Sequence, residues 1–132
     1  MNTITIVGNV GKPVELKFSQ GGMAVGTFTV ATTSGKDDKK VTVWHNVTVF
    51  GQMAEYTAGS LEKGSRVIVV GKLDISSYEK DGQKKYTTKI LADEIGLTCR
   101  FNPVMQDKTT QVVANVKKDF GNIGFLEQEE AF

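Results

Sequence analysis

The sequence predicts an all-β fold: a small five-stranded barrel with one short helix, followed by a tail. The first hundred residues are rich in Thr, Val and Ile and punctuated by Gly, which is typical of strands. A length of 132 residues suits one domain, and 39% apolar residues can supply its core. Sustained periodicity ends after Arg100. We therefore expect one domain over residues 1–100 and a partly disordered tail over residues 101–132.

Five segments of the chain have the composition of strands, and turn residues separate them. The expected strands are Thr3 to Asn9 (with pairing resumed over Glu15–Phe18 after a turn at residues 11–13), Met23 to Thr33, Val41 to Phe50, Arg66 to Ile75 and Tyr86 to Leu97. Two polar turns are expected at residues 35–40 and 79–84, the second centred on Asp81 and Gly82.

A short helix is predicted between the third and fourth strands. Met53, Tyr56 and Leu61 recur at roughly helical spacing within residues 52–62, between Gly51 and Gly64. The resulting order, β-β-β-α-β-β, suits a five-stranded OB-fold barrel, a fold that often binds oligonucleotides. Other small barrels can produce the same order.

The third expected strand carries two aromatic residues among polar ones. Successive side chains point to opposite faces of a strand, so one row should face the core and the other solvent. Trp44 and Phe50 fall in the row with threonines and asparagine. An aromatic ring on a wet face can stack on nucleobases, which contributes about 1–3 kcal/mol per base. The alternative is that the helix, the tail or a second subunit covers both rings. The expected core row is Val41, Val43, His45, Val47 and Val49.

Lysines cluster at the two later hairpins, beside two tyrosines. Basic groups interleaved with aromatic rings suit a single nucleic-acid strand, because cations follow phosphates while rings take bases. Lysine-bearing hairpins are also common as ordinary solubilising surface. The candidate residues are Lys36, Lys39 and Lys40 at the first hairpin, Lys84 and Lys85 flanking the turn of the second, Tyr78 and Tyr86 beside that turn, and Lys72 on the fourth expected strand.

Charge is distributed unevenly, although the net charge is only +1. Residues 119–132 hold four of the 15 acidic residues and none of the 16 basic ones, which leaves residues 1–118 with a net charge of +5. The body is therefore mildly basic and the end acidic.

No enzyme site, metal site or cofactor motif is expected. There is one histidine and one cysteine, and no ligand set has zinc-type spacing. His45 on a valine face is better read as a packed or interface residue than as a catalyst. Glycine-rich phosphate-binding motifs and nucleophile–base pairs are missing from the sequence. A single cysteine, no signal-like start and no long apolar segment predict a cytoplasmic protein with no membrane contact.

The chain resembles the bacterial single-stranded DNA-binding protein family, in its cellular and phage-encoded forms. The Trp-His-x-Val-x-x-Phe-Gly block is the most specific part of the match. The resemblance implies an OB-fold and a homo-oligomer, expected as a tetramer, on single-stranded DNA. The matching stretches, in order, are residues 6–15, 31–33, 44–55, 61–67, 71–73 and 86–88.

The resemblance also implies roles for individual residues. Trp44 and Phe50 fall on stacking aromatics of the family, Tyr78 falls where an aromatic is frequent, and Lys63 falls on a basic position. Lys36 stands where many relatives carry a further stacking tryptophan, which predicts weaker or narrower binding.

The end of the chain resembles the family's acidic tip, which closes on phenylalanine and binds replication and repair proteins. Residues 127–132 read Glu-Gln-Glu-Glu-Ala-Phe, with alanine where proline is usual. A solubilising acidic tail is the simpler alternative. The residues expected to bind partner proteins are Glu127, Glu129, Glu130, Ala131 and Phe132.

Two functions therefore follow from the sequence. The first is sequence-independent coating of single-stranded DNA in replication, recombination and repair, with recruitment of proteins through the tip. The second is that of a primosome-type relative, whose OB-fold acts mainly in protein assembly.

Overall fold

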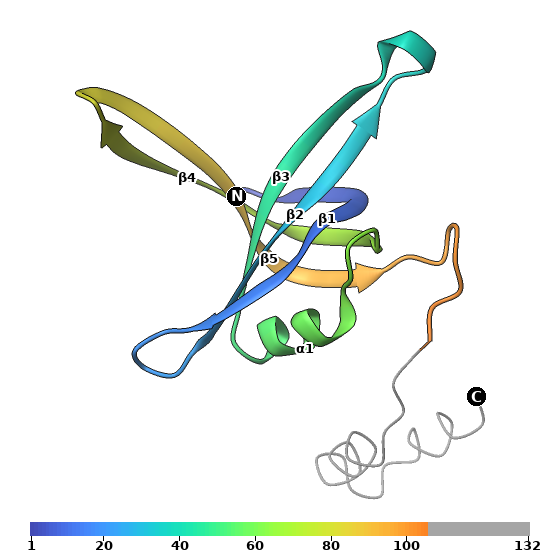
Figure 1. Ribbon diagram of the computed structural model, residues 1–132, viewed down its shortest axis with the longest axis horizontal. Helices are drawn as coiled ribbons and strands as arrows, with labels where there is room; N and C mark the ends of the chain where they lie inside the picture. The colour runs from blue at the N-terminus through green and yellow to red at the C-terminus, as the bar shows by residue number, and fades with distance from the viewer. Residues whose placement is uncertain (106–132) are drawn as a thin grey trace, which may run out of the picture. The chain divides into compact units, whose positions relative to one another are not determined.

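Five strands close into a barrel in the computed structural model of the protein, which describes residues 1–105 (Figure 1). The strand order around the barrel is β1-β2-β3-β5-β4. This arrangement, with the helix between the third and fourth strands, confirms the predicted OB-fold. The elements are β1 (Ile4–Phe18), β2 (Ala24–Ser34), β3 (Val41–Phe50), α1 (Gln52–Ser60), β4 (Arg66–Lys80) and β5 (Gln83–Leu97), with a 3₁₀ turn at Asp37–Lys39.

Strand β1 closes the barrel because it pairs with two neighbours. Asn9 is the Cα partner of Ala31 on β2 and also of Arg66 on β4. The turn that the sequence predicts at residues 11–13 is wrong: the strand continues through irregularities between Val10 and Lys12 and between Lys12 and Glu15. Bulges of this kind absorb extra residues and increase the bend of a strand, so the Gly-Lys-Pro segment stays within β1.

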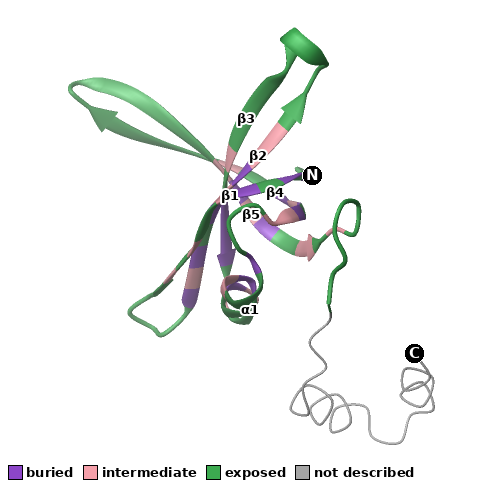
Figure 2. Cartoon of the chain, turned by 45° about the vertical axis from the view of Figure 1, so that its right-hand side comes forward, coloured by how far each residue is buried: buried purple, intermediate pink, exposed green. Residues whose placement is uncertain are grey.

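The core fills the barrel and continues under the helix (Figure 2). Ala54 of α1 and Leu61, which follows it, belong to this core. The helix ends at Ser60, two residues earlier than expected, and the Leu61 N–H donates to the Thr57 carbonyl oxygen at 3.0 Å. The core residues are Ile6, Val10, Ala24, Phe28, Val30, Val47, Val49, Ala54, Leu61, Val67, Val69, Ile90 and Ala92.

Two hairpins extend beyond the barrel as arms, and their outer parts are exposed (Figures 1 and 2). We call them the β2–β3 arm (residues 32–43) and the β4–β5 arm (residues 74–89). Strands β4 and β5 are longer than predicted because their turn is reduced to Asp81 and Gly82, with φ of 55° and 77°. Two successive positive φ values are those of a type I′ turn, which matches the twist of the strands and lets pairing continue to the tip.

The β2–β3 arm corrects the expected core row of β3. Val47 and Val49 are buried, but Val41 and Val43 are 56% and 47% exposed. Side chains still point to alternate faces of β3. Val41 and Val43, however, lie where the hairpin has left the barrel, so no opposing sheet covers them. Thr48, expected on the wet face, is buried where β3 pairs with Leu91 of β5.

Within residues 1–105, no helix is long and apolar enough to cross a membrane. Contacts between Cα atoms divide the chain into a first unit, Met1–Asn102, and a second, Pro103–Phe132. The sequence predicts partial disorder over residues 101–132. Residues from 106 onward lie outside the described part of the chain.

Candidate nucleic-acid interface

Trp44 lies on the solvent side of the sheet formed by β1, β2 and β3. Its Cα partner on β2 is Ala31, and the far edge of its indole reaches across to Gly11 of β1. A side chain at Gly11 would collide with ring atoms Cζ3 and Cη2. Because glycine leaves this space free, the indole settles against the sheet and the residue remains 61% exposed. We call this solvent-facing surface of β1, β2 and β3 the outer face.

Phe50 occupies the other end of the same face. Six residues separate it from Trp44, which at about 3.3 Å per residue places the two rings roughly 20 Å apart along β3. Phe50 is also exposed, so neither ring is covered by the helix or by another part of residues 1–105.

Two lysines on β1 accompany these rings, and the sequence analysis missed both. Lys12 is the partner of Thr29, which is the partner of Asn46 on β3. Lys17 is the partner of Val25, which in turn is the partner of Phe50. Only the register across three strands brings these residues into line, and the expected turn at residues 11–13 concealed it.

The β4–β5 arm separates the two tyrosines that the sequence placed together. Tyr78 is paired with Lys85, so both point to the solvent-side face of the arm. Tyr86 is paired with Ser77 on the opposite face, which continues the core side of the barrel. The ammonium group of Lys84 lies 5.8 Å from the centre of the Tyr86 ring. The arm therefore offers a lysine beside a tyrosine on each of its faces.

The remaining candidate lysines lie at three separate places. Lys36, Lys39 and Lys40 are at the tip of the β2–β3 arm, and Lys72 is at the base of the β4–β5 arm, on the face of Tyr78. Lys63 precedes Gly64, whose N–H donates to the Val10 carbonyl oxygen at 2.8 Å, so it lies at the edge of the barrel.

The candidate lysines from the sequence form no ion pairs within the described part of the chain. The two pairs found there are Lys17 with Glu15 and Lys89 with Asp74, and neither involves a lysine that the sequence singled out. Residues 1–105 contain no cluster of His, Cys, Asp or Glu that could hold a metal ion. The tip residues 127–132 lie outside the described residues.

His45 is partly buried on the core side of β3. Its Nε2 lies 2.9 Å from Oγ1 of Thr32, at hydrogen-bond distance. This is the packed environment that the sequence favoured over a catalytic one.

The closed five-stranded barrel, with exposed rings on one face and unpaired lysines around it, is that of an OB-fold binding module. The Single-strand binding protein family matches residues 1–98 of the chain. The protein belongs to this family.

Curated relatives support the same assignment. A single-stranded DNA-binding protein of Xylella fastidiosa is 38% identical over 101 residues, which span 72% of this chain but only 62% of that protein. One from Paenarthrobacter aurescens is 36% identical over 130 residues, covering 92% of this chain and 74% of its own length. One from Xanthomonas campestris is 39% identical over 101 residues, covering 72% and 59% respectively.

Gly11→Ala should move the indole of Trp44 without unfolding the barrel. The added Cβ overlaps the far edge of a ring that can rotate away from the sheet. We expect the emission of this single tryptophan to shift to longer wavelength and to become more accessible to acrylamide. Gly21→Ala is the matched control, because nothing lies within 4 Å of its added Cβ. Unchanged emission of Gly11→Ala would show that the indole does not rest on β1.

Proposed function

We propose that the protein coats single-stranded DNA without sequence preference, and acts in replication, recombination and repair. The observation that carries this proposal is the exposed indole of Trp44, held on the outer face of the barrel. The family membership and the names of the curated relatives support it. In this proposal the chain is a binding protein of the cytoplasm rather than an enzyme.

The chemistry of the outer face explains why a single strand is the preferred ligand. Every base has a π-face, so stacking on Trp44 and Phe50 is tolerant of sequence. A duplex already stacks its bases on one another and presents only its phosphates. The lysines neutralise phosphates of either form, so rings, not charges, provide the discrimination.

Distribution of charge suggests how the strand is held along the molecule. Lys12 and Lys17 flank the outer face, while Lys36, Lys39 and Lys40 extend it along one arm. On the other arm, Lys72 and Lys85 share a face with Tyr78, and Lys84 stands beside Tyr86. We assign phosphate contacts to these lysines and base contacts to the rings.

A homotetramer is the proposed assembly. Val7 on β1 and Ile68 on β4 are Cα partners, both exposed on the solvent side of the barrel, and Gly96 on β5 lies beside Ile68. These three residues form an apolar strip across three strands. Burial of the strip against a second copy removes its apolar area from water, which is favourable.

The acidic segment Glu127–Phe132 is proposed to recruit replication and repair proteins. Glutamates next to a phenylalanine suit a basic pocket with an apolar slot, since the ring supplies the anchor and the carboxylates the charge. The residues assigned this role are Glu127, Glu129, Glu130, Ala131 and Phe132.

Fluorescence of Trp44 tests DNA binding directly, since the chain has one tryptophan. We expect quenching by an unstructured single strand and poor competition from duplex. Trp44→Ala should weaken binding, measured by anisotropy of a labelled strand, by about 1–3 kcal/mol. Equal quenching by duplex and single strand would contradict the stacking mechanism. Absence of binding by either form would favour the primosome-type alternative, an OB-fold that acts in protein assembly.

Ile68→Asp should disrupt the assembly. The wild type should sediment at about four times the 14.4 kDa mass of the chain at micromolar concentration. A carboxylate placed in the apolar strip would be buried without a partner, which is strongly unfavourable. We expect smaller species from this variant, while Phe18→Ser, a change at an exposed residue at the end of β1, keeps the wild-type mass. A wild type that sediments as a monomer would refute the assembly.

Deletion of residues 127–132 should separate DNA binding from partner capture. The barrel keeps its rings, and three carboxylates are lost, so affinity for a single strand should stay equal or rise slightly at low salt. Salt should erase the gain, because exposed charges are screened beyond about 10 Å at 0.1 M.

Phe132→Ala should abolish capture of replication and repair proteins in pull-downs from a lysate of the source organism, while Phe125→Ala serves as the matched control. Loss of DNA binding on deletion, with partners still captured, would instead place the segment in the DNA site.

A further inference from the structure

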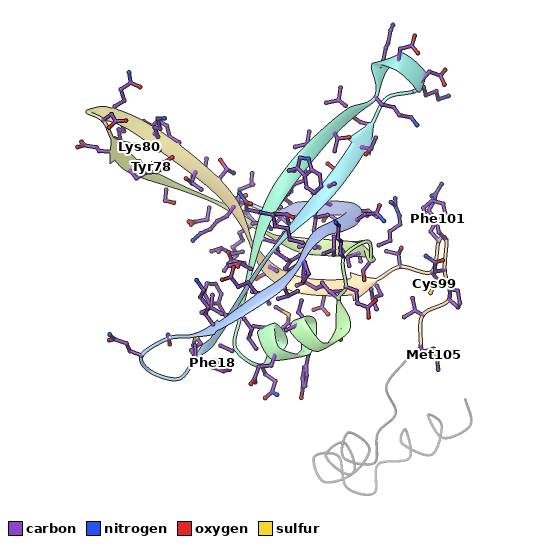
Figure 3. All side chains as sticks on the ribbon, in the orientation of Figure 1. Phe18, Tyr78, Lys80, Cys99, Phe101 and Met105 are labelled. Carbon is purple, nitrogen blue, oxygen red and sulfur yellow. The ribbon has the colours of Figure 1, made fainter. Side chains whose placement is uncertain are left out.

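An arginine-flanked phenylalanine lies just beyond the last strand. Phe101 is 65% exposed, although an aromatic ring gains most from burial. The guanidinium carbon of Arg66 lies 5.0 Å from the centre of its ring, and that of Arg100 lies 5.3 Å away. We call these three residues the Phe101 cluster. Figure 3 shows Phe101 on the segment after β5, away from the arm that carries Tyr78.

One member of the cluster, Arg66, is anchored to the barrel. Arg66 begins β4, and its Nη1 donates to Oδ1 of Asn9 at 3.0 Å. Asn9 in turn donates from Nδ2 to the carbonyl oxygen of Gly64 at 3.1 Å. Through these bonds the first strand fixes the guanidinium that lies over the ring.

The register connects this cluster to Trp44. Arg66, Asn9, Ala31 and Trp44 are successive Cα partners across β4, β1, β2 and β3. Three strand spacings of about 4.8 Å place the two ends of this row roughly 14 Å apart. The indole of Trp44 already covers part of the gap, because it reaches Gly11 on β1. One surface therefore runs from the tryptophan to the Phe101 cluster.

The charges of the cluster are not neutralised within the described part of the chain. Neither Arg66 nor Arg100 takes part in an ion pair there, and Nε of Arg66 is buried without a hydrogen-bond partner among residues 1–105. Lys63 adds a third cation next to Gly64. Unpaired guanidinium groups beside an exposed ring match the chemistry of a nucleotide, whose phosphate takes the cation and whose base takes the ring.

We propose that the Phe101 cluster is a second nucleotide-binding platform, on which a strand bound at Trp44 continues across β1. When a strand binds, the exposed guanidinium of Arg100 moves from the Phe101 ring to a phosphate. A base then stacks on the ring in place of the guanidinium. A stacked base contributes more than an exposed cation–π contact, so the exchange is favourable. Arg66 stays in position because Asn9 holds it. This inference rests on the proposed binding of single-stranded DNA.

A relocated tryptophan tests the platform directly. In a Trp44→Phe background, Phe101→Trp makes residue 101 the single tryptophan of the full-length chain. We expect oligothymidylate of about 16 nucleotides, the upper end of OB-fold site sizes, to quench it. Phe18→Trp in the same background is the matched control, because Phe18 is 61% exposed but lies at the β1–β2 turn. Its fluorescence should not change.

Affinity measurements with the single variants complete the test. Phe101→Ala should weaken binding of the 16-nucleotide strand at least about fivefold, the lower end for loss of one stacked base. Binding of an oligothymidylate of about 4 nucleotides, the lower end of site sizes, should weaken less. Arg100→Ala should reduce the slope of log K against log salt by about 1.

Three results would separate failure of this inference from failure of the proposed function. If Trp44 of the wild type is quenched but the tryptophan introduced by Phe101→Trp is not, the platform is refuted and DNA binding stands. If Phe101→Ala changes the sedimenting mass and leaves the affinity unaltered, the cluster is a subunit contact and the platform is again refuted. If neither tryptophan is quenched, the proposed function itself fails.

Discussion

The double pairing of β1 is the constraint on which the rest of the molecule depends. One strand must satisfy β2 along its second half and β4 along its first, and Asn9 is shared by both ladders. A bulge bends a strand, so the irregularities beside Gly11 take up the change of direction between these two neighbours. Closure of the barrel, burial of its valine-rich interior and the geometry of the outer face all follow from this one bend.

The same bend creates the support for the exposed indole. Gly11 lies within the first irregularity of β1 and leaves the space that the ring of Trp44 occupies. A tryptophan fixed in this way loses little conformational freedom when a flat ligand stacks on it, because the sheet has already limited its rotation. Preorganisation of the ring is thus a consequence of how the barrel closes.

The β4–β5 arm presents different side chains on its two faces, because side chains alternate along each strand. On the β4–β5 arm, one face carries Tyr78 with Lys85 and the other carries Tyr86 with Lys84. Because successive residues point to opposite sides, one bound strand cannot stack on both tyrosines from the same side. An arm that leaves the barrel can instead be approached from both sides, by DNA or by another copy.

By itself, the sequence determined the class of fold, the place of the helix between the third and fourth strands, and both ends of the third strand. It could do so because hydrophobic alternation and turn glycines act locally. It also selected Trp44 and Phe50, since a ring among polar residues on a strand is a local signal. Tertiary structure alone placed Gly11 under Trp44, Lys12 and Lys17 in line with the outer face, and Phe101 between two arginines, and it exposed Val41 and Val43. These depend on register across strands that are distant in the sequence, and on where the hairpins leave the barrel, which no local pattern encodes.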